Sequence, residues 1–488
     1  MTRLIAFLAL VFLLAGCGRF GNEILPMPQY TGEEISGYFE MSDVAPKQVE
    51  ISAPIEVPPP EVPRYNEYRI SLDVNPEKRV VSGISHITFT NRASVPLDDI
   101  VLRVFLDAYM KIQYAFLDNE PLEFELDETV LRLILPEPLQ PHATVQILLQ
   151  YNASVPKTAH LTGGNDYALW FGMFLPVLSV FDEQDGWFTR AFYPVGNPFL
   201  LETANFRVDI TTPARYVVVG TGLRTEEVIS DTDTRITNFA AHQARDFSFA
   251  VSPYFRHVYT STKSGIDIHL YYYTKTLFTD EILDIARRTM EFFEARVGVF
   301  PLGKVTIVEA DLPQDSVSFS QMVFANSSYL THSERYWAVA HGLGNQWLAN
   351  IIGTNRITEP WLTEGLTRFI QAGIFYPTPQ AFRDRMEREH ASIEARTTLF
   401  INRGLDASPN RAHFAHTHGR KAMLMTYALH HRMGDDLFWQ FINAYYQNFS
   451  FAIATQSDFI ALAEELYGAS LQALFDEWMT VGTVPELP

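Results

Sequence analysis

Two different hydrophobic patterns divide the chain near residue 256. In the first part, apolar residues alternate with polar ones, as at Tyr68, Ile70 and Leu72. The runs with this alternation are 68–74, 102–106, 145–149 and 206–210, and turn residues separate them. A period of two is typical of half-buried strands. We therefore predict that residues 64–256 form an antiparallel, β-sandwich-like domain.

Helical spacing of apolar residues begins only after this domain. From Thr279 they recur every three to four positions, with Thr279 or Asp280 as the expected cap and Gly298 at the exit. A short strand is predicted at 305–308, and amphipathic helices are predicted at 333–351 and 420–433. The order of elements predicts an α+β multidomain chain whose second domain, residues 257–488, is mainly α-helical.

The first 17 residues have the layout of a secretory signal, with Arg3 before an apolar run at 4–14 and small residues before Cys17. The end of this run resembles the lipobox of bacterial lipoproteins, in which the cysteine is diacylated and becomes the mature N-terminus. Lipid attachment at Cys17 would explain why the chain contains a single cysteine. The alternatives are an ordinary cleaved signal and an uncleaved anchor.

Residues 18–63 carry eight of the 28 prolines and favour a solvated, acidic tether. If Cys17 is acylated, the protein is extracytoplasmic and anchored to the bacterial cell membrane or outer membrane, with the membrane as its first partner. The tether would then hold the folded body away from the lipid.

Composition narrows the remaining function classes. Of the 488 residues, 47% are hydrophobic, which is far too many for a disordered chain. A formal charge of -20 opposes binding to phosphate backbones, so we expect no nucleic-acid partner. One cysteine excludes an intramolecular disulfide and a cysteine-rich metal site.

The most informative segment is 338–347, AVAHGLGNQW, which WLTEG follows at 361–365. It is similar to the signature of the gluzincin zinc aminopeptidases of the membrane alanyl aminopeptidase type, in which H-E-x-x-H precedes a glutamate by 18 residues. Asn345 and Glu364 preserve this spacing. The likeness extends over residues 65–488 and implies a thermolysin-like second domain.

The resemblance assigns three zinc-ligand positions, which are His341, Asn345 and Glu364 here. Two histidines one helical turn apart can reach a single zinc, but an amide is a poor replacement for the second imidazole. The position of the general base is occupied by Gly342, which has no side chain to accept a proton. We therefore expect vestigial metal positions that bind zinc weakly or not at all.

Two further positions depart from the resembled family. Val323 stands where a glutamate would hold the substrate's amino terminus, and valine cannot pair with an ammonium group. Gly419 falls near the position of the tyrosine that would stabilise the oxyanion. The resemblance therefore leaves no intact catalytic residue.

A substitute metal site is conceivable at His413, His416 and His418, of which the first two have i, i+3 spacing. The alternative for these histidines is a polar turn before the next helix. An isolated histidine on a helix, such as His341, is more often a core residue than a metal ligand.

Three functions remain open. The first is a catalytically inactive peptidase homologue that binds a peptide or protein in the former active-site cleft or on its outer surface. The second is an active zinc-dependent aminopeptidase with atypical ligands. The third is a structural envelope component whose cleft has no ligand.

Overall fold

The computed structural model describes residues 65–157, 161–193, 195–275, 277–332 and 335–488. Contacts divide the chain into residues 1–59 and 60–488, and only the second unit is described below. The predicted signal, Cys17 and the tether lie outside the described residues. In the described part, no helix is both long enough and apolar enough to cross a bilayer.

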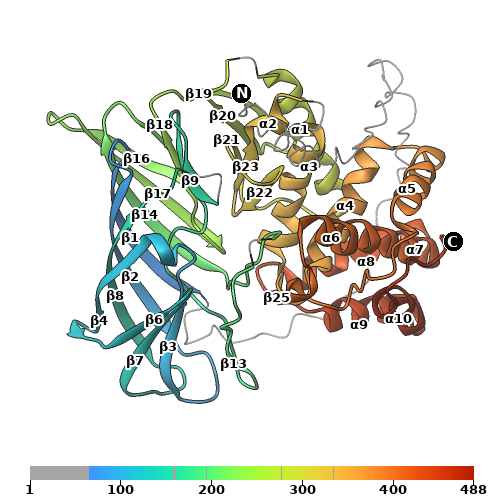
Figure 1. Cartoon of the computed structure of the whole chain (residues 1–488), viewed down its shortest axis with the longest axis horizontal. Helices are drawn as coiled ribbons and strands as arrows, with labels where there is room; N and C mark the ends of the chain where they lie inside the picture. The colour runs from blue at the N-terminus through green and yellow to red at the C-terminus, as the bar shows by residue number, and fades with distance from the viewer. Residues whose placement is uncertain (1–64, 158–160, 194, 276, 333–334) are drawn as a thin grey trace, which may run out of the picture. The chain divides into compact units, whose positions relative to one another are not determined.

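The first domain is built from strands, as the alternating pattern predicted (Figure 1). Its largest sheet contains, in spatial order, β16 (Leu223–Ile229), β17 (Thr234–Ala244), β14 (Ala204–Pro213), β1 (Asn66–Asn75), β2 (Val80–Thr90), β8 (Thr144–Ser154), β4 (Met110–Leu117) and β5 (Glu120–Pro121). Along β1, Tyr68, Ile70 and Leu72 are buried while the polar residues between them face outward. One pairing is not antiparallel, because β1 runs parallel to β14.

Smaller sheets complete this domain. One contains β15 (Val217–Gly220), β18 (Phe249–Ser252), β10 (Leu169–Phe171) and β9 (Thr162–Gly164), and another contains β11 (Val177–Leu178), β3 (Leu97–Arg103), β7 (Val130–Leu139) and β6 (Phe124–Asp127). A two-stranded hairpin consists of β12 (Phe181–Asp182) and β13 (Gly186–Trp187).

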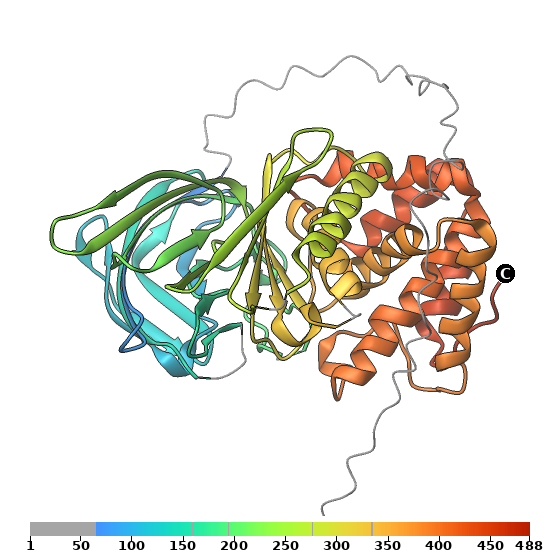
Figure 2. The same ribbon diagram turned by 90° about the horizontal axis from the view of Figure 1, so that it is seen from above.

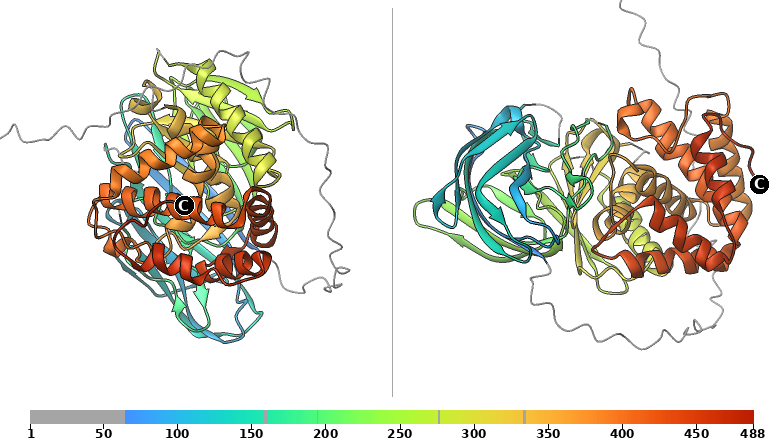
Figure 3. Two further views of the ribbon diagram at one scale, coloured as in Figure 1. Left: turned by 90° about the vertical axis from the view of Figure 1, so that its right-hand side faces the viewer. Right: turned by 90° about the horizontal axis from the view of Figure 1, so that it is seen from below.

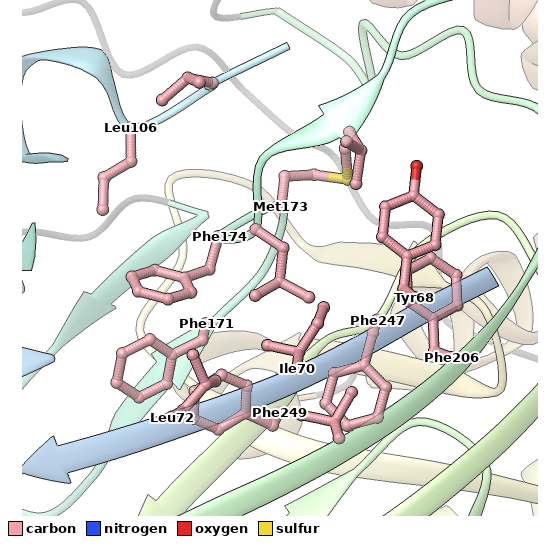
Figure 4. Packing of buried hydrophobic residues seen from close by; sticks show 14 of the residues in the cluster. Tyr68, Ile70, Leu72, Leu106, Phe171, Met173, Phe174, Phe206, Phe247 and Phe249 are labelled. Carbon is pink, nitrogen blue, oxygen red and sulfur yellow. The ribbon is translucent and has the colours of Figure 1, made fainter. Parts of the chain in front are cut away.

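Aromatic rings fill the core between the sheets (Figure 4). Tyr68 of β1 stacks on Phe206 of β14 with ring centroids 4.6 Å apart. Phe171 stacks in the same way on Phe249 at 4.1 Å. Burial of such large apolar surfaces is the main source of stability for a domain of this kind.

A five-stranded sheet follows, although the sequence pattern indicates only one strand after residue 257. It contains β19 (Arg256–Ser261), β20 (Asp267–Tyr272), β21 (Lys304–Ala310), β23 (Met322–Asn326) and β22 (Ser316–Phe319). The remaining strands, β24 (Gly353–Thr354) and β25 (Ile453–Ala454), form a short pair. Helices α1 (Thr279–Arg296) and α3 (Arg335–Asn345) pack against the five-stranded sheet (Figure 2).

The helix at 279 begins as predicted, but its cap differs. Phe278 occupies the N-cap position without a side-chain hydrogen bond. Asp280 and Glu281 lie in the first turn, where their negative charge interacts favourably with the helix dipole.

The short helix α2 (Ser327–Leu330) packs against α3, β21 and β23. The remaining helices pack together at the C-terminal end (Figure 3). They are α4 (Trp361–Phe375), α5 (Pro379–Ile393), α6 (Arg411–Phe414), α7 (Ala422–Met433), α8 (Asp435–Phe449), α9 (Gln456–Tyr467) and α10 (Gln472–Thr480). The helix predicted at 333–351 ends in a π-helical segment, η2 (Gln346–Ile351), which follows α3. A second π-helical segment, η4 (Ala415–Lys421), precedes α7 and overlaps only the start of the helix predicted at 420–433. Short 3-10 turns are present at η1 (Asp107–Tyr109) and η3 (Leu405–Ala407). The predicted order of a β domain and then a mainly helical domain is confirmed.

Candidate functional site

Helices α3 and α4 bring together the three predicted ligand positions. His341 and Asn345 lie one turn apart on α3, Glu364 lies in the first turn of α4, and all three side chains are buried. His341 Nε2 is 3.4 Å from Glu364 Oε2, and Asn345 Nδ2 is 3.3 Å from the same imidazole nitrogen. The spacing in the sequence therefore produces a real cluster.

Two further side chains of α4 orient this cluster. His341 Nδ1 lies 3.3 Å from Gln371 Oε1, and because an amide oxygen only accepts, Nδ1 is the donor. Nε2 consequently faces Asn345 and Glu364. Thr367 Oγ1 donates to Asn345 Oδ1 at 2.7 Å. Sequence analysis missed Thr367 and Gln371, although their offsets of three and seven residues from Glu364 place them on one helical face.

Glu364 is ionised in this setting. Burial, the largest influence, raises the pKa of its carboxyl, but His341, Arg368 and Arg356 together outweigh burial and lower that pKa to about 2. Arg368 lies one turn further along α4, with its Nε 3.9 Å from Glu364 Oε2. The carboxylate is thus compensated by the chain's own cationic groups.

The donor set does not fit the three-ligand zinc site of the resembled family. His341 and Glu364 offer good zinc donors, but Asn345 turns its NH₂ group toward the imidazole and its oxygen toward Thr367. Among the described residues, no group of three His, Cys, Asp or Glu side chains is placed to hold a metal ion.

Gly342, at the position of the missing general base, faces Val323 of β23, the strand that pairs with the edge strand β22. A Cβ atom at Gly342 would lie 2.4 Å from Cγ1 of Val323 and 3.3 Å from Oγ of Ser316. Val323 is fully buried in β23. Two positions that the resemblance assigns to catalytic glutamates are therefore packed against each other.

The π-helical segment η2 fixes this sheet edge in place. Gln346 Nε2 donates to Ser318 Oγ at 2.8 Å, and its Oε1 accepts from the backbone N–H of Gln321 at 2.9 Å. Asn350 Nδ2 also donates to Ser318 Oγ, at 2.9 Å. Sequence analysis predicted a regular helix here and did not identify Gln346 or Asn350.

Gly419 lies buried in the second π-helical segment, η4. A Cβ at this position would come within 2.8 Å of Arg368 Nε. The space beside Gly419 is thus occupied by the guanidinium that also faces Glu364.

The three histidines before α7 do not form a polar turn, because α6 and η4 contain them. Burial lowers the pKa of His416 to about 4 and that of His418 to about 3. Their Nδ1 atoms have no hydrogen-bond partner in the described part of the chain. His413 Nε2 lies 3.2 Å from the carbonyl oxygen of Thr398. The substitute metal site stays a prediction without support from this geometry.

Residues 283–478 match the family model of the peptidase family M1 domain. These residues therefore form a peptidase family M1 domain. This confirms the expected relationship to the gluzincin aminopeptidases.

Solved structures give the same fold over most of the chain. The M1 zinc metallopeptidase from Deinococcus radiodurans aligns with a TM-score of 0.68 and 18% identity, covering 88% of this chain and 96% of the other. A mutant of that enzyme with a Tyr-Ser-Ala substrate aligns with a TM-score of 0.68 and 17% identity, covering 88% and 97%. Comparison with curated proteins finds no match.

Proposed function

We propose that this protein is a catalytically inactive M1 peptidase homologue that binds a peptide or protein ligand in the cell envelope. The observation that carries the proposal is the close approach of Gly342 and Val323. Neither residue has a carboxylate, and a Cβ atom at 342 would stand 2.4 Å from Cγ1 of Val323. A glutamate at Gly342 would have to displace a buried valine.

The state of the former ligand positions supports the same function. His341 contacts both Asn345 and Glu364. Two polar side chains of α4, Gln371 and Thr367, contact His341 and Asn345. Such a buried, hydrogen-bonded network holds its shape without an ion. Zinc, if it binds, is therefore expected to be weakly held.

The proposed ligand class comes from the fold relatives. The enzyme from Deinococcus radiodurans has been solved with a tripeptide substrate. A homologue that keeps the two-domain fold without the reactive groups is suited to hold a peptide without cleaving it. Anchoring through Cys17 places this binding function at a membrane surface outside the cytoplasm.

The second candidate is an active zinc aminopeptidase with atypical ligands. In its favour, His341 Nε2 and Glu364 Oε2, the two good donor atoms, lie 3.4 Å apart, which is about the separation of two ligands on one tetrahedral zinc. The two candidates make opposite predictions about turnover.

An aminopeptidase assay on the purified full chain decides between them. We expect no hydrolysis of Tyr-Ser-Ala, with or without added zinc. The matched control is His341→Ala, which removes the better of the two remaining donors. Chelator-sensitive turnover by the wild type that His341→Ala abolishes would overturn the proposal and establish the second candidate.

A further inference from the structure

A cavity of about 370 Å³ lies in the β domain, apart from the cluster around His341. Four turns that are distant in the sequence form it. Its walls come from the β1–β2 turn, the loop between β9 and β10, the β14–β15 turn and the residues that follow β18. A volume of this size is within the roughly 300–1,000 Å³ typical of small-molecule sites.

Two tyrosines form an exposed aromatic wall in this cavity. Tyr167 and Tyr254 are 55% and 57% exposed, and their rings meet edge to face at 5.9 Å. The Tyr167 ring also stacks on the ring of Tyr273, with centroids 5.5 Å apart. Large aromatic surfaces of this kind remain in contact with water only at a cost, so an adjacent pair in a concave site points to a ligand.

Hydrogen bonds from neighbouring side chains hold the backbone of Tyr167 in place. Ser252 Oγ donates to the carbonyl oxygen of Tyr167 at 2.6 Å, and Asn165 Oδ1 accepts from the N–H of Tyr167 at 2.8 Å. Asn165 in turn donates to the hydroxyl of Tyr273 at 2.9 Å. Because the loop is fixed before binding, a ligand would not have to order it.

The charged groups of the cavity are largely balanced. Arg79 donates to four backbone carbonyls, those of Val155, Pro156, Gly164 and Asn165, and is therefore part of the cavity frame. Arg215 pairs with Glu77 at 2.7 Å and stacks over the ring of Tyr216 at 5.2 Å. Asp166 supplies an exposed carboxylate at the same site. Such a balance does not favour a phosphate or an ammonium ion over a neutral ligand.

We propose that this cavity binds a neutral carbohydrate. A pyranose ring has an apolar C–H face that packs on tyrosine rings and hydroxyl groups that bond to charged side chains. Tyr167 and Tyr254 supply the packing surface. The carboxylate of Asp166 accepts from sugar hydroxyls and the guanidinium of Arg215 donates to them. This site is independent of whether the M1 domain is catalytically active.

Isothermal titration of the full chain tests the proposal in two parallel arms, with β-1,4-linked N-acetylglucosamine oligomers and with α-1,4-linked glucose oligomers. We expect saturable binding in at least one arm, and the arm that binds identifies the source of the sugar. Tyr167→Ala and Tyr254→Ala should each weaken binding about tenfold, the effect of losing about one aromatic contact. Tyr259→Ala is the matched control, because Tyr259 is 64% exposed on β19 and does not line the cavity.

Asp166→Asn provides a variant whose folding is not in question, since Asp166 is exposed. It should weaken binding several-fold because the carboxylate is the stronger acceptor. Absence of binding in both arms at millimolar oligosaccharide would overturn the proposal. So would equal affinities of the wild type and the Tyr167 and Tyr254 variants, or saturable binding of inorganic phosphate or tetramethylammonium at this site instead of sugar.

Discussion

Gly342 of α3 and Val323 of β23 occupy one shared space: a Cβ atom on the glycine would stand 2.4 Å from Cγ1 of the valine. Real Cβ atoms do not approach so closely, so a side chain at 342 forces a buried neighbour to move. The side chain at either position therefore limits the size of the side chain that fits at the other.

This contact predicts energetic coupling between the two positions. Gly342→Ala gains up to about 1 kcal/mol of helix propensity, but overpacking typically costs about 1–3 kcal/mol, so we expect a net loss of stability. In a Val323→Ala background the overlap disappears and the same change should be neutral or stabilising. Urea unfolding of the wild type, both single variants and the double variant measures the coupling.

Gly344→Ala is the matched control for this cycle. Its Cβ would meet Phe293 at 2.6 Å and Thr367 at 2.9 Å, with Val323 not among its nearest neighbours. It should destabilise the protein without coupling to Val323→Ala. Additive effects of Gly342→Ala and Val323→Ala would show that the helix and the strand adjust freely.

The donor set leads to a prediction about metal. The purified wild type should retain well under one zinc per chain after dialysis, because only His341 and Glu364 are good donors. Asn345→His should raise zinc retention, since it restores a second imidazole one turn from His341. Elemental analysis of each protein gives the stoichiometry.

His341→Ala in the Asn345→His background serves as the control and should return zinc to the wild-type level. Stoichiometric zinc in the wild type that survives a mild chelator would contradict the prediction. It would mean that Asn345 ligates through its oxygen, at the expense of the bond that Thr367 makes.

The ligand cluster could be predicted because the chain resembles the gluzincin signature, whose 18-residue spacing assigned Glu364. Helix geometry explains why His341 and Asn345, four residues apart, share one face of α3. The strand at 68–74 could also be predicted from the sequence, because a strand with one buried face has an apolar residue at every second position.

Other features depend on packing between distant segments and have no local signal. The π-helical segment at 346–351 was predicted as ordinary helix, because the contacts of Gln346 and Asn350 with the hairpin at 316–326 leave no local signal in the sequence. The second π-helical segment, 415–421, lies mostly before the helix predicted at 420–433, in residues for which a polar turn was considered. The close approach of Gly342 and Val323 depends on how α3 packs against β23, and nothing in the sequence indicates that this helix and this strand are neighbours.

Lipid attachment is predicted at Cys17, the single cysteine, which ends a signal-like apolar run. The mature protein should begin at Cys17 and partition into detergent. Mass spectrometry of the N-terminus tests this directly. Cys17→Ala should release the body into the aqueous phase or leave the signal uncleaved, whereas a wild type that still begins at Met1 would refute the prediction.

Arg245 is predicted to be essential for joining the β domain to the helical part. Its buried guanidinium donates to the carbonyl oxygens of Leu201, Asn350 and Ile351 at 2.8–2.9 Å. Burial lowers the pKa of Arg245 to about 9, which leaves it charged at neutral pH. Arg245→Leu leaves these carbonyl oxygens without a hydrogen-bond donor and should lower the free energy of unfolding by about 3–5 kcal/mol.

Denaturant unfolding measures this loss, with Arg403→Ala as the control. Arg403 is exposed and stacks over Phe400 at 4.1 Å, so its removal should change stability by less than about 1 kcal/mol. A small effect of Arg245→Leu would mean that water or neighbouring side chains replace the lost donors.

The buried histidine of η4 predicts how stability depends on pH. Burial lowers the pKa of His418 to about 3, whereas an unfolded chain has an ordinary histidine pKa of about 6.5. Between these values the unfolded chain binds a proton that the folded chain does not. Stability from this group is therefore fully present above about pH 6.5 and falls as the pH is lowered toward 3.

His418→Leu removes this linkage while filling a buried position, and Nδ1 of His418 has no partner in the described residues that the change would strand. Relative to the wild type, the variant should gain about 2–3 kcal/mol between pH 7 and pH 4.5, at about 1.4 kcal/mol per pH unit below 6.5. Thermal unfolding of both proteins across this range measures the difference. His431→Leu, at an exposed histidine of α7, controls for loss of an imidazole as such. If the difference in Tm between the wild type and the His418→Leu variant stays constant from pH 7 to 4.5, His418 is protonated, or reaches water, in the folded protein.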